Sequence, residues 1–198
     1  MKQPNIIFFL ADDLGWRDLT CTGSEFYETP SVDRIRSNGM MFTDAYAACP
    51  VCSPTRASIL TGKYPARLGI TDWIDWFGHI HPVRGKLVDV PYRKELSRDE
   101  RTIAHSLRAA GYATWHIGKW HLGSEGRLPT DFGFDVNIGG GLEGSPGQGG
   151  YFSPWTISDL SDTDVPEGTY LTDYLGDAAV KLIQDHADSD ADPAPFYL

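Results

Sequence analysis

The chain has 198 residues, enough for one domain with a substantial core, and is 41% hydrophobic and 22% charged, the composition of a soluble globular protein. Acidic residues outnumber basic ones by 27 to 17, which gives a net charge of -10. This balance argues against a nucleic-acid partner, because nucleic-acid binders usually present a basic face. It does not exclude an anionic substrate, since a few cations in one pocket can outweigh a distant acidic surface.

The early apolar segment, residues 6–11, is too short to span a bilayer and is followed by Asp12 and Asp13. It also lacks the flanks of a signal peptide, with one lysine before it and no small-residue cleavage site after it. We therefore expect no membrane association. The sequence as given favours the cytoplasm, or the periplasm or secretion if a leader has been removed.

The first part of the chain is predicted to alternate between strands and helices. Residues 5–11 form the continuous apolar run that is typical of a buried parallel strand. The next predicted elements are a helix from Thr29-Pro30-Ser31 to Gly39, a strand at residues 41–47 and a helix from Ser53-Pro54 to Gly62.

The rest of the chain continues this alternation after residues 69–98, a stretch without a steady period that is predicted to be a long loop or an insertion. The next predicted elements are a helix that ends at Gly111, with Ile103, Ala104, Leu107 and Ala110 on one face, and a strand at 112–117. Residues 137–150 are predicted to be a mobile or ligand-binding glycine-rich loop. A helix from Leu171 to Leu182 and the opening of a strand at 195–198 follow. The alternation predicts an α/β fold, with helices sandwiching a mostly parallel sheet. Because the chain stops in its last predicted strand, we expect residues 1–198 to be an incomplete catalytic domain.

Three polar segments follow directly on predicted strands: Asp12-Asp13, Cys52 and Lys119-Trp120-His121. In parallel sheets of this kind the site lies beyond the carboxyl ends of the strands, so we expect the three segments to converge. Two adjacent carboxylates after a buried strand suit a hard divalent cation such as Ca²⁺ or Mg²⁺. A solvated turn is the alternative interpretation of Asp12-Asp13.

Cys52 is predicted to lie just before a helix amino terminus, with Ser53 as the cap and Pro54 at the first helical position. Such a terminus offers free N–H groups to an anion, and Arg56 in the first turn adds a planar fork of donors. A buried cysteine with a surface arginine, and an unmodified thiolate nucleophile, are the alternatives at this point. Cys49 and Cys52 also match the C-x-x-C pattern of redox sites.

Lys119 and His121 are predicted to share one face of an extended segment, with Trp120 packed on the opposite face. A structural strand end is the alternative. His105 and His116 lie among helix and strand residues and are predicted to be structural. In the irregular stretch, the side chains that could line a sugar or aryl subsite, or simply pack the loop, are Trp73, Trp76, His79 and His81.

Cys52-x-Pro54-x-Arg56, followed by Ala57-Ser58-Ile59-Leu60-Thr61-Gly62, resembles the sulfatase signature, in which the cysteine is oxidised to Cα-formylglycine. Other segments similar to the family's patterns occur in the right order: Asn5-Ile6-Ile7 through Ala11-Asp12-Asp13-Leu14-Gly15, Thr29-Pro30 with its helix, and Gly118-Lys119-Trp120-His121-Leu122-Gly123. The resemblance runs from about residue 5 to residue 198, and it disfavours the redox interpretation of the cysteine pair.

The resemblance implies an alkaline-phosphatase-like sulfatase fold, truncated here, and the hydrolysis of sulfate esters. It implies that Asp12, Asp13 and the modified Cys52 ligate Ca²⁺ or Mg²⁺. The implied partners are a sulfated small molecule or glycan as substrate and a formylglycine-generating maturation enzyme. Further metal ligands, a histidine and a lysine are expected beyond Leu198.

The resemblance also implies catalytic roles. The hydrated aldehyde of Cys52 attacks sulfur, and its second hydroxyl then expels sulfate. Arg56 stabilises the modified residue, Lys119 contacts the sulfuryl oxygens, and His121 hydrogen-bonds the formylglycine hydroxyl. A phosphonate monoester or phosphodiester hydrolase of the same superfamily is the alternative function, because both esters are tetrahedral, and a non-catalytic sulfated-glycan binding module is a third.

Overall fold

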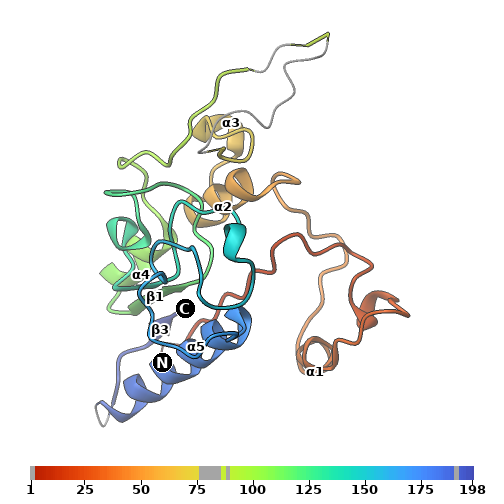
Figure 1. Ribbon diagram of the computed structural model, residues 1–198, viewed down its shortest axis with the longest axis vertical. Helices are drawn as coiled ribbons and strands as arrows, with labels where there is room; N and C mark the ends of the chain where they lie inside the picture. Colours follow the sequence, from red (N-terminus) through yellow and green to blue (C-terminus); the bar gives the residue numbers. More distant parts are fainter. Residues whose placement is uncertain (1–2, 76–85, 88–89, 190–191) are drawn as a thin grey trace. The chain divides into compact units, whose positions relative to one another are not determined.

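The computed structural model describes residues 3–75, 86–87, 90–189 and 192–198. The chain divides into two compact units (Figure 1). We call the larger one the core unit; it comprises Met1–Phe8 and Ala48–Leu198. The smaller one, Phe9–Ala47, is called the small unit. Each is described by itself.

A parallel sheet with the strand order β2-β1-β3 organises the core unit. The central strand β1, Ala113–Ile117, pairs with β2, Val136–Ile138, and with β3, Phe196–Tyr197. In this register Trp115 lies opposite Val136, and Ala113 lies opposite Phe196. The strands at 112–117 and 195–198 are therefore confirmed as elements, whereas β2 lies where only a glycine-rich loop was predicted.

The predicted first strand, residues 5–11, is much shorter in the structure. Ile6 forms an isolated parallel bridge with Tyr197, and its N–H donates to the carbonyl of Phe196 at 2.8 Å. The pairing reaches Phe8, whose N–H donates to the carbonyl of Leu198 at 2.7 Å. The side chains of Phe8 and Phe9 are 49% and 88% exposed. The prediction of a buried strand over the whole run is wrong, because the apolar run after Phe8 has no strand partner among the described residues.

The helices of the core unit are α2 Cys52–Thr61, α3 Pro65–Leu68, α4 Ile103–Ala109 and α5 Leu171–Asp188, with 3-10 turns η2 Pro129–Phe132 and η3 Gly147–Gly149. Of these, α2 and α4 follow their predicted boundaries closely, whereas α5 continues past the predicted end at Leu182 and α3 was not predicted. Gly62 ends α2 with a φ of 69°, a conformation that favours glycine. Both α4 and α5 contact β1 (Figure 1), so the helices cover the sheet as the alternation predicted. No helix in the described ranges is long and apolar enough to cross a bilayer.

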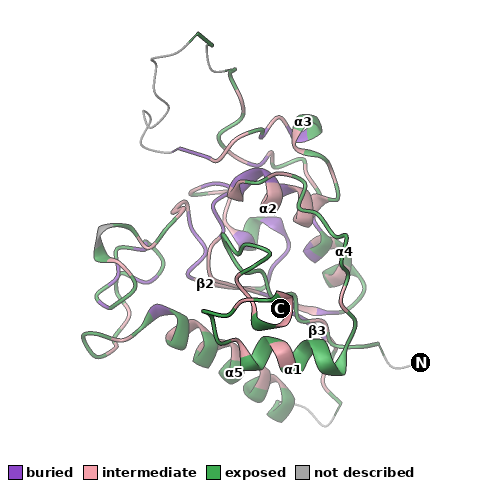
Figure 2. Cartoon of the chain, turned by 90° about the vertical axis from the view of Figure 1, so that its right-hand side faces the viewer, coloured by how far each residue is buried: buried purple, intermediate pink, exposed green. Residues whose placement is uncertain are grey.

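The core unit has two hydrophobic clusters, and most buried segments in Figure 2 lie around α2. The larger cluster packs Trp120, Phe132 and Phe134 beside the sheet, and the Trp120 and Phe132 rings lie 5.6 Å apart. The smaller cluster consists of Trp155, Ile157, Leu160 and Leu171, the last of which opens α5.

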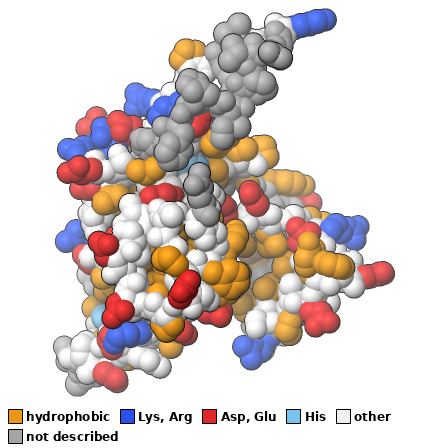
Figure 3. Space-filling view, in the orientation of Figure 1, with side chains coloured by type: hydrophobic (Ala, Val, Ile, Leu, Met, Phe, Trp, Pro, Cys, Tyr) orange, Lys and Arg blue, Asp and Glu red, His pale blue; other side chains and the backbone are white. Residues whose placement is uncertain are grey.

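Acidic side chains are scattered over the face shown in Figure 3, in keeping with the net charge of -10.

The small unit contains η1, Thr20–Thr22, and α1, Pro30–Asn38. Pro30 opens α1 and Gly39 caps it, so this predicted helix is confirmed. The two elements are joined by a hydrogen bond from the Cys21 N–H to Asp33 Oδ1 at 3.0 Å.

Residues 41–47 of the small unit form turns and irregular structure, so the strand predicted there is wrong. Phe42 and Tyr46 in this segment are 71% and 87% exposed, and no strand pairs with it within the described parts of the chain.

The described part of residues 69–98 contains no helix or strand, in agreement with the loop prediction. It nevertheless contributes Ile70, Ile74 and Leu96 to the core, each 1% exposed or less. Trp73 accepts a hydrogen bond at its carbonyl from the Tyr92 hydroxyl at 2.6 Å. Trp76, His79 and His81 lie outside the described residues.

Candidate active site

Cys52 is the first residue of α2, and Val51 is the N-cap with φ -129° and ψ 161°. The prediction that Ser53 caps this helix and Pro54 opens it is therefore wrong, and Cys52 lies two positions further into the helix than expected. Ser53 is fully buried and directs its hydroxyl to other partners. The N–H groups of Cys52 and Ser53 open the helix and have no carbonyl partner within it, so the environment of Cys52 remains favourable for an anion.

His121 contacts Cys52 across 69 residues of sequence, with its Nδ1 3.3 Å from Cys52 Sγ. The imidazole is buried, and its Nε2 lies 2.7 Å from the carbonyl oxygen of Ile74. A carbonyl only accepts hydrogen bonds, so we assign a proton to Nε2; in the neutral imidazole Nδ1 is then the acceptor that faces Cys52. The backbone of His121 has a φ of 58°, so the chain turns here rather than continuing β1.

Arg56 connects α2 to the same segment by donating a hydrogen bond from its guanidinium to the carbonyl of Lys119. Lys119 therefore enters the site by its main chain, and the role of its ammonium stays a prediction. Trp120 is 1% exposed and packs in the core as predicted, but His121 is also buried and has a φ of 58°, so the extended alternation predicted for residues 119–121 does not continue to His121. The structure thus brings Cys52, Arg56, Lys119 and His121 together at the carboxyl end of β1.

The glycine-rich loop packs on the two histidines that flank Lys119. The carbonyl of Gly141 accepts a hydrogen bond from the His121 N–H at 3.0 Å. A Cβ at Gly144 would lie 2.5 Å from Cε1 of His121, and one at Gly140 would lie 2.8 Å from Nδ1 of His116. Glycine is required at both positions because any side chain would displace an imidazole. The loop predicted to be mobile or ligand-binding therefore packs against a site residue.

His116 and His105 are structural, as the sequence predicted. His116 packs against Trp120 and Phe134, with both ring centroids 5.4 Å away. Burial lowers the pKa of His116 to about 4, and the charge of Arg56 acts in the same direction, while the neighbouring Asn137 side chain opposes them. His105 forms a capping box with Thr102 at the start of α4. Burial, Arg101 and Arg108 lower the pKa of His105.

Asp12 and Asp13 lie in an exposed turn of the small unit, and Asp13 has a φ of 54°. They belong to a different unit from Cys52, and each unit is described by itself. Their predicted meeting with Cys52 therefore stays a prediction. Within the described residues, no three His, Cys, Asp or Glu side chains come together as metal ligands.

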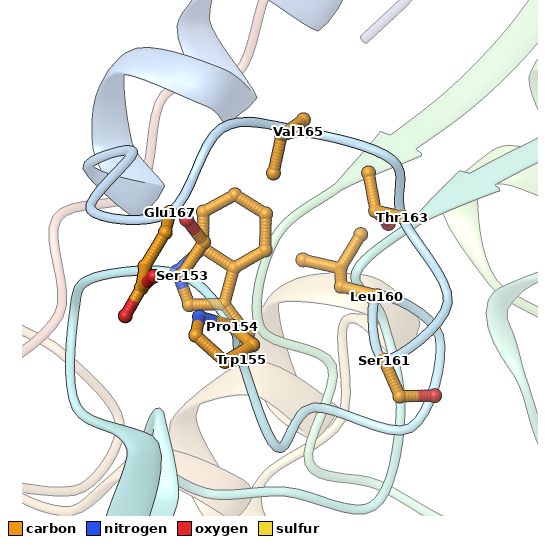
Figure 4. Close-up of a pocket in the computed structure, with 8 residues that line it drawn as sticks. All are labelled: Ser153, Pro154, Trp155, Leu160, Ser161, Thr163, Val165 and Glu167. Carbon is orange, nitrogen blue, oxygen red and sulfur yellow. The ribbon is translucent and has the colours of Figure 1, made fainter.

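A pocket of about 330 Å³ lies elsewhere in the core unit, and Figure 4 shows the indole of Trp155 between Glu167 and Leu160. Its lining shares no residue with the site around Cys52. Trp155 and Leu160 are 4% and 3% exposed and belong to the smaller core cluster. This pocket is therefore a depression over packed core.

Sequence reasoning missed three contributors to the site: the carbonyl of Ile74, the hydroxyl of Ser53 and Gly144. Each acts through a contact with His121 made across a long loop. The glycine run in the sequence was the one available signal, and it was interpreted as ligand binding.

Comparison with known proteins agrees with this geometry. The Sulfatase family model matches residues 4–198. Human steryl-sulfatase is 38% identical over 163 residues, which are 77% of this chain and 27% of that protein. Mouse arylsulfatase G is 42% identical over 138 residues, 69% of this chain and 24% of that protein.

Solved structures show the same likeness. The crystal structure of Ps i-CgsB superposes with a TM-score of 0.75 and 31% identity, over all of this chain and 44% of that one. The structure of BT4656 in complex with its substrate D-glucosamine-2-N,6-O-disulfate gives a TM-score of 0.68 and 29% identity, over 99% of this chain and 33% of that one.

The fold and the segments that converge on Cys52 define a sulfatase-type α/β domain, and the chain belongs to the sulfatase family. It spans about a quarter of the length of the curated relatives it matches. The fold is accordingly a truncated version of the alkaline-phosphatase-like fold of its structural neighbours.

Proposed function

We propose that the enzyme to which this chain belongs hydrolyses sulfate esters through a formylglycine made from Cys52. The observation that carries the proposal is the 3.3 Å contact between Cys52 Sγ and His121 Nδ1. It joins the two most specific sequence patterns of the chain, Cys52-x-Pro54-x-Arg56 and Gly118-Lys119-Trp120-His121, in a single site. Membership of the sulfatase family supports the same reaction.

Conversion would replace the thiol of Cys52 with an aldehyde, which adds water to give two hydroxyls on one carbon. One hydroxyl oxygen attacks the sulfur atom, the sulfur–oxygen bond of the ester breaks, and the alcohol leaves with a proton. The second hydroxyl then loses its proton, the aldehyde re-forms, and sulfate departs. The nucleophile is thereby regenerated without attack by water on a stable sulfate ester.

His121 suits a part in this cycle because its Nδ1 is an acceptor at the position of the reacting group. It can accept a hydrogen bond from a hydroxyl on the converted Cys52 and orient that hydroxyl. Arg56 of α2 and Lys119 supply positive charge for the sulfuryl oxygens. The free N–H groups at the start of α2 act in the same sense.

A divalent cation, Ca²⁺ or Mg²⁺, completes the proposed site. Asp12, Asp13 and the converted Cys52 would hold it, and their oxygen atoms are the donors that hard cations prefer. Both carboxylates are exposed in one turn, which leaves them accessible to an ion. When bound, the ion supplies Lewis-acid stabilisation of developing negative charge.

We propose a sulfated small molecule or glycan as the substrate. Steryl-sulfatase, arylsulfatase G and a structural neighbour bound to a disulfated glucosamine support this class. A formylglycine-generating enzyme is the maturation partner that the proposed chemistry requires.

The experiment expresses the complete enzyme with a maturation enzyme and follows the peptide that contains Cys52 by mass spectrometry. We expect loss of the thiol, reaction of the new aldehyde with a hydrazide, and turnover of an aryl sulfate. Cys52→Ala should abolish the hydrazide reaction and the turnover, whereas Cys49→Ser, the matched control for the neighbouring cysteine, should retain them. Persistence of the Cys52 thiol would contradict the mechanism. Preferential turnover of a phosphonate monoester or phosphodiester would contradict the substrate class, and binding of a sulfated glycan without turnover would contradict catalysis.

A further inference from the structure

We propose that Ser53 is a positioning residue, whose buried hydroxyl holds the imidazole of His121 in the orientation that faces position 52. The inference rests on the proposed function, since it assigns a role in the same site. Its starting point is that the hydroxyl does not cap α2, although Ser53 follows the first residue of that helix.

The contacts of the Ser53 hydroxyl determine its direction. The side chain is 0% exposed, and its Oγ accepts a hydrogen bond from the Ile74 N–H at 3.0 Å. The same oxygen lies 3.3 Å from Nδ1 of His121. A serine hydroxyl has one proton to donate, and Nδ1 is an acceptor here, so the proton points at the imidazole.

Ile74 closes the arrangement into a ring of hydrogen bonds. Its N–H donates to Ser53, Ser53 donates to Nδ1 of His121, and Nε2–H of His121 donates back to the Ile74 carbonyl at 2.7 Å. Each group is used in the direction that its chemistry permits, and the ring is consistent with only one neutral tautomer of His121. This ring joins the loop that carries Ile74 to the start of α2 and to the segment after β1.

The consequence for the site is that Ser53 and position 52 share one acceptor. Nδ1 lies 3.3 Å from both Cys52 Sγ and Ser53 Oγ. A hydroxyl on the converted Cys52 would find this nitrogen already oriented, with its lone pair directed at the start of α2. Gly144 also packs against this imidazole, where a Cβ would lie 2.5 Å from Cε1, and so limits movement of the ring.

Removing the hydroxyl has two effects. The buried Ile74 N–H loses its partner, and Nδ1 of the imidazole loses the donor that Ser53 supplies. The orientation of Nδ1 toward position 52 is then less defined, which slows a step that depends on that orientation. Substrate binding does not use Ser53, so affinity should change little.

The test compares Ser53→Ala with Ser58→Ala in the complete, converted enzyme. Ser58 is the matched control because it lies on the same helix and its buried Oγ has no hydrogen-bond partner among the described residues. We expect Ser53→Ala to lower kcat about tenfold and to leave KM within about twofold. Ser58→Ala should leave both unchanged. Rates are normalised to the formylglycine content and to the folded fraction.

Nitrogen-15 NMR of the histidine side chains provides a readout that a purely structural role would not move. In the wild-type protein His121 should show a protonated Nε2 and an unprotonated Nδ1. Loss of the Ser53 donor should shift the Nδ1 resonance downfield, whereas Ser58→Ala should not. Ser53→Thr, which keeps the hydroxyl, should restore the wild-type resonance wherever the extra methyl group is accommodated.

An unchanged Nδ1 resonance and unchanged kcat in Ser53→Ala would overturn the proposal. So would a loss of kcat that disappears when rates are normalised to the folded fraction, because Ser53 would then act on stability alone. The NMR readout separates this outcome from failure of the proposed function. A wild-type enzyme that does not hydrolyse sulfate esters would contradict that function, while the Nδ1 resonance would still report on Ser53.

Discussion

The core unit buries large side chains around its sheet, whereas the small unit, Phe9–Ala47, buries none of its residues, all of which the structure describes. Trp120 of the core unit is 1% exposed and Ile35 of the small unit is 72% exposed. Both units nevertheless contain helices that the sequence predicted. The difference shows that a helix can follow from local signals, while a strand requires partners.

The contrast between α1 and residues 41–47 makes this point within one unit. Pro30 favours the start of α1 through its fixed φ, and the chain leaves the helix at Gly39. The apolar residues at 41–47 have equally suitable β propensity, but the hydrogen bonds of a strand come from another segment. Ile6 forms its bridge because Tyr197 lies beside it.

Core truncation should give the largest difference between the units. Trp120→Ala removes an indole that packs against Phe132 and donates to the Arg127 carbonyl at 2.8 Å. We expect the free energy of unfolding to fall by about 3–5 kcal/mol. Ile35→Ala, on the exposed surface of α1, should change it by less than about 0.5 kcal/mol. Chemical denaturation measures both, and equal losses would contradict the contrast in packing.

The pH dependence of stability tests burial in the core unit at a single residue. The pKa of His116 is lowered from 6.5 to about 4, so between these pH values the unfolded chain binds a proton that the folded chain does not. Neutral His116 therefore makes its full contribution to the free energy of unfolding above about pH 6.5. As the pH drops toward 4, the free energy of unfolding falls by about 3 kcal/mol because of this group.

His116→Gln should reduce this slope, measured by urea denaturation at several pH values. Some slope should remain, because burial also lowers the pKa of His105. Identical pH dependence of the free energy of unfolding in the wild type and in His116→Gln would contradict this prediction. It would show that the folded protein protonates His116 as readily as the unfolded chain does.

Asp13 tests whether the small unit has a functional role despite its exposed surface. Asp13→Asn keeps the shape of the side chain and removes one charged metal ligand, so kcat/KM of the complete enzyme should fall roughly a hundredfold. The free energy of unfolding without added metal should stay within about 0.5 kcal/mol of the wild-type value, because Asp13 is exposed.

Asp18→Asn is a poor control for this test, since the Asp18 carboxylate accepts a hydrogen bond from the Gly15 N–H at 2.7 Å. Asp44→Asn is the better one, because the only hydrogen bond to this exposed side chain in the described structure comes from neighbouring Thr43. Retained activity in Asp13→Asn would remove Asp13 from the metal site.

Sequence patterns predicted most helices, the central strand and the meeting of Cys52 with His121. They succeeded where a short string carries its own chemistry, as in Cys52-x-Pro54-x-Arg56. They failed for Ser53, because its position one residue from a helix start is equally consistent with a cap. The ring that joins Ser53, Ile74 and His121 depends on contacts across a long loop, and no local pattern encodes it.

The most direct test of the account is a crystal structure of the complete, converted enzyme with Ca²⁺, since it asks whether residues of both units form one site. The account predicts one ion with oxygen atoms of Asp12, Asp13 and residue 52 at about 2.3–2.6 Å, and with His121 beside the formylglycine. Asp12 and Asp13 at the opposite end of the sheet from residue 52 would contradict it.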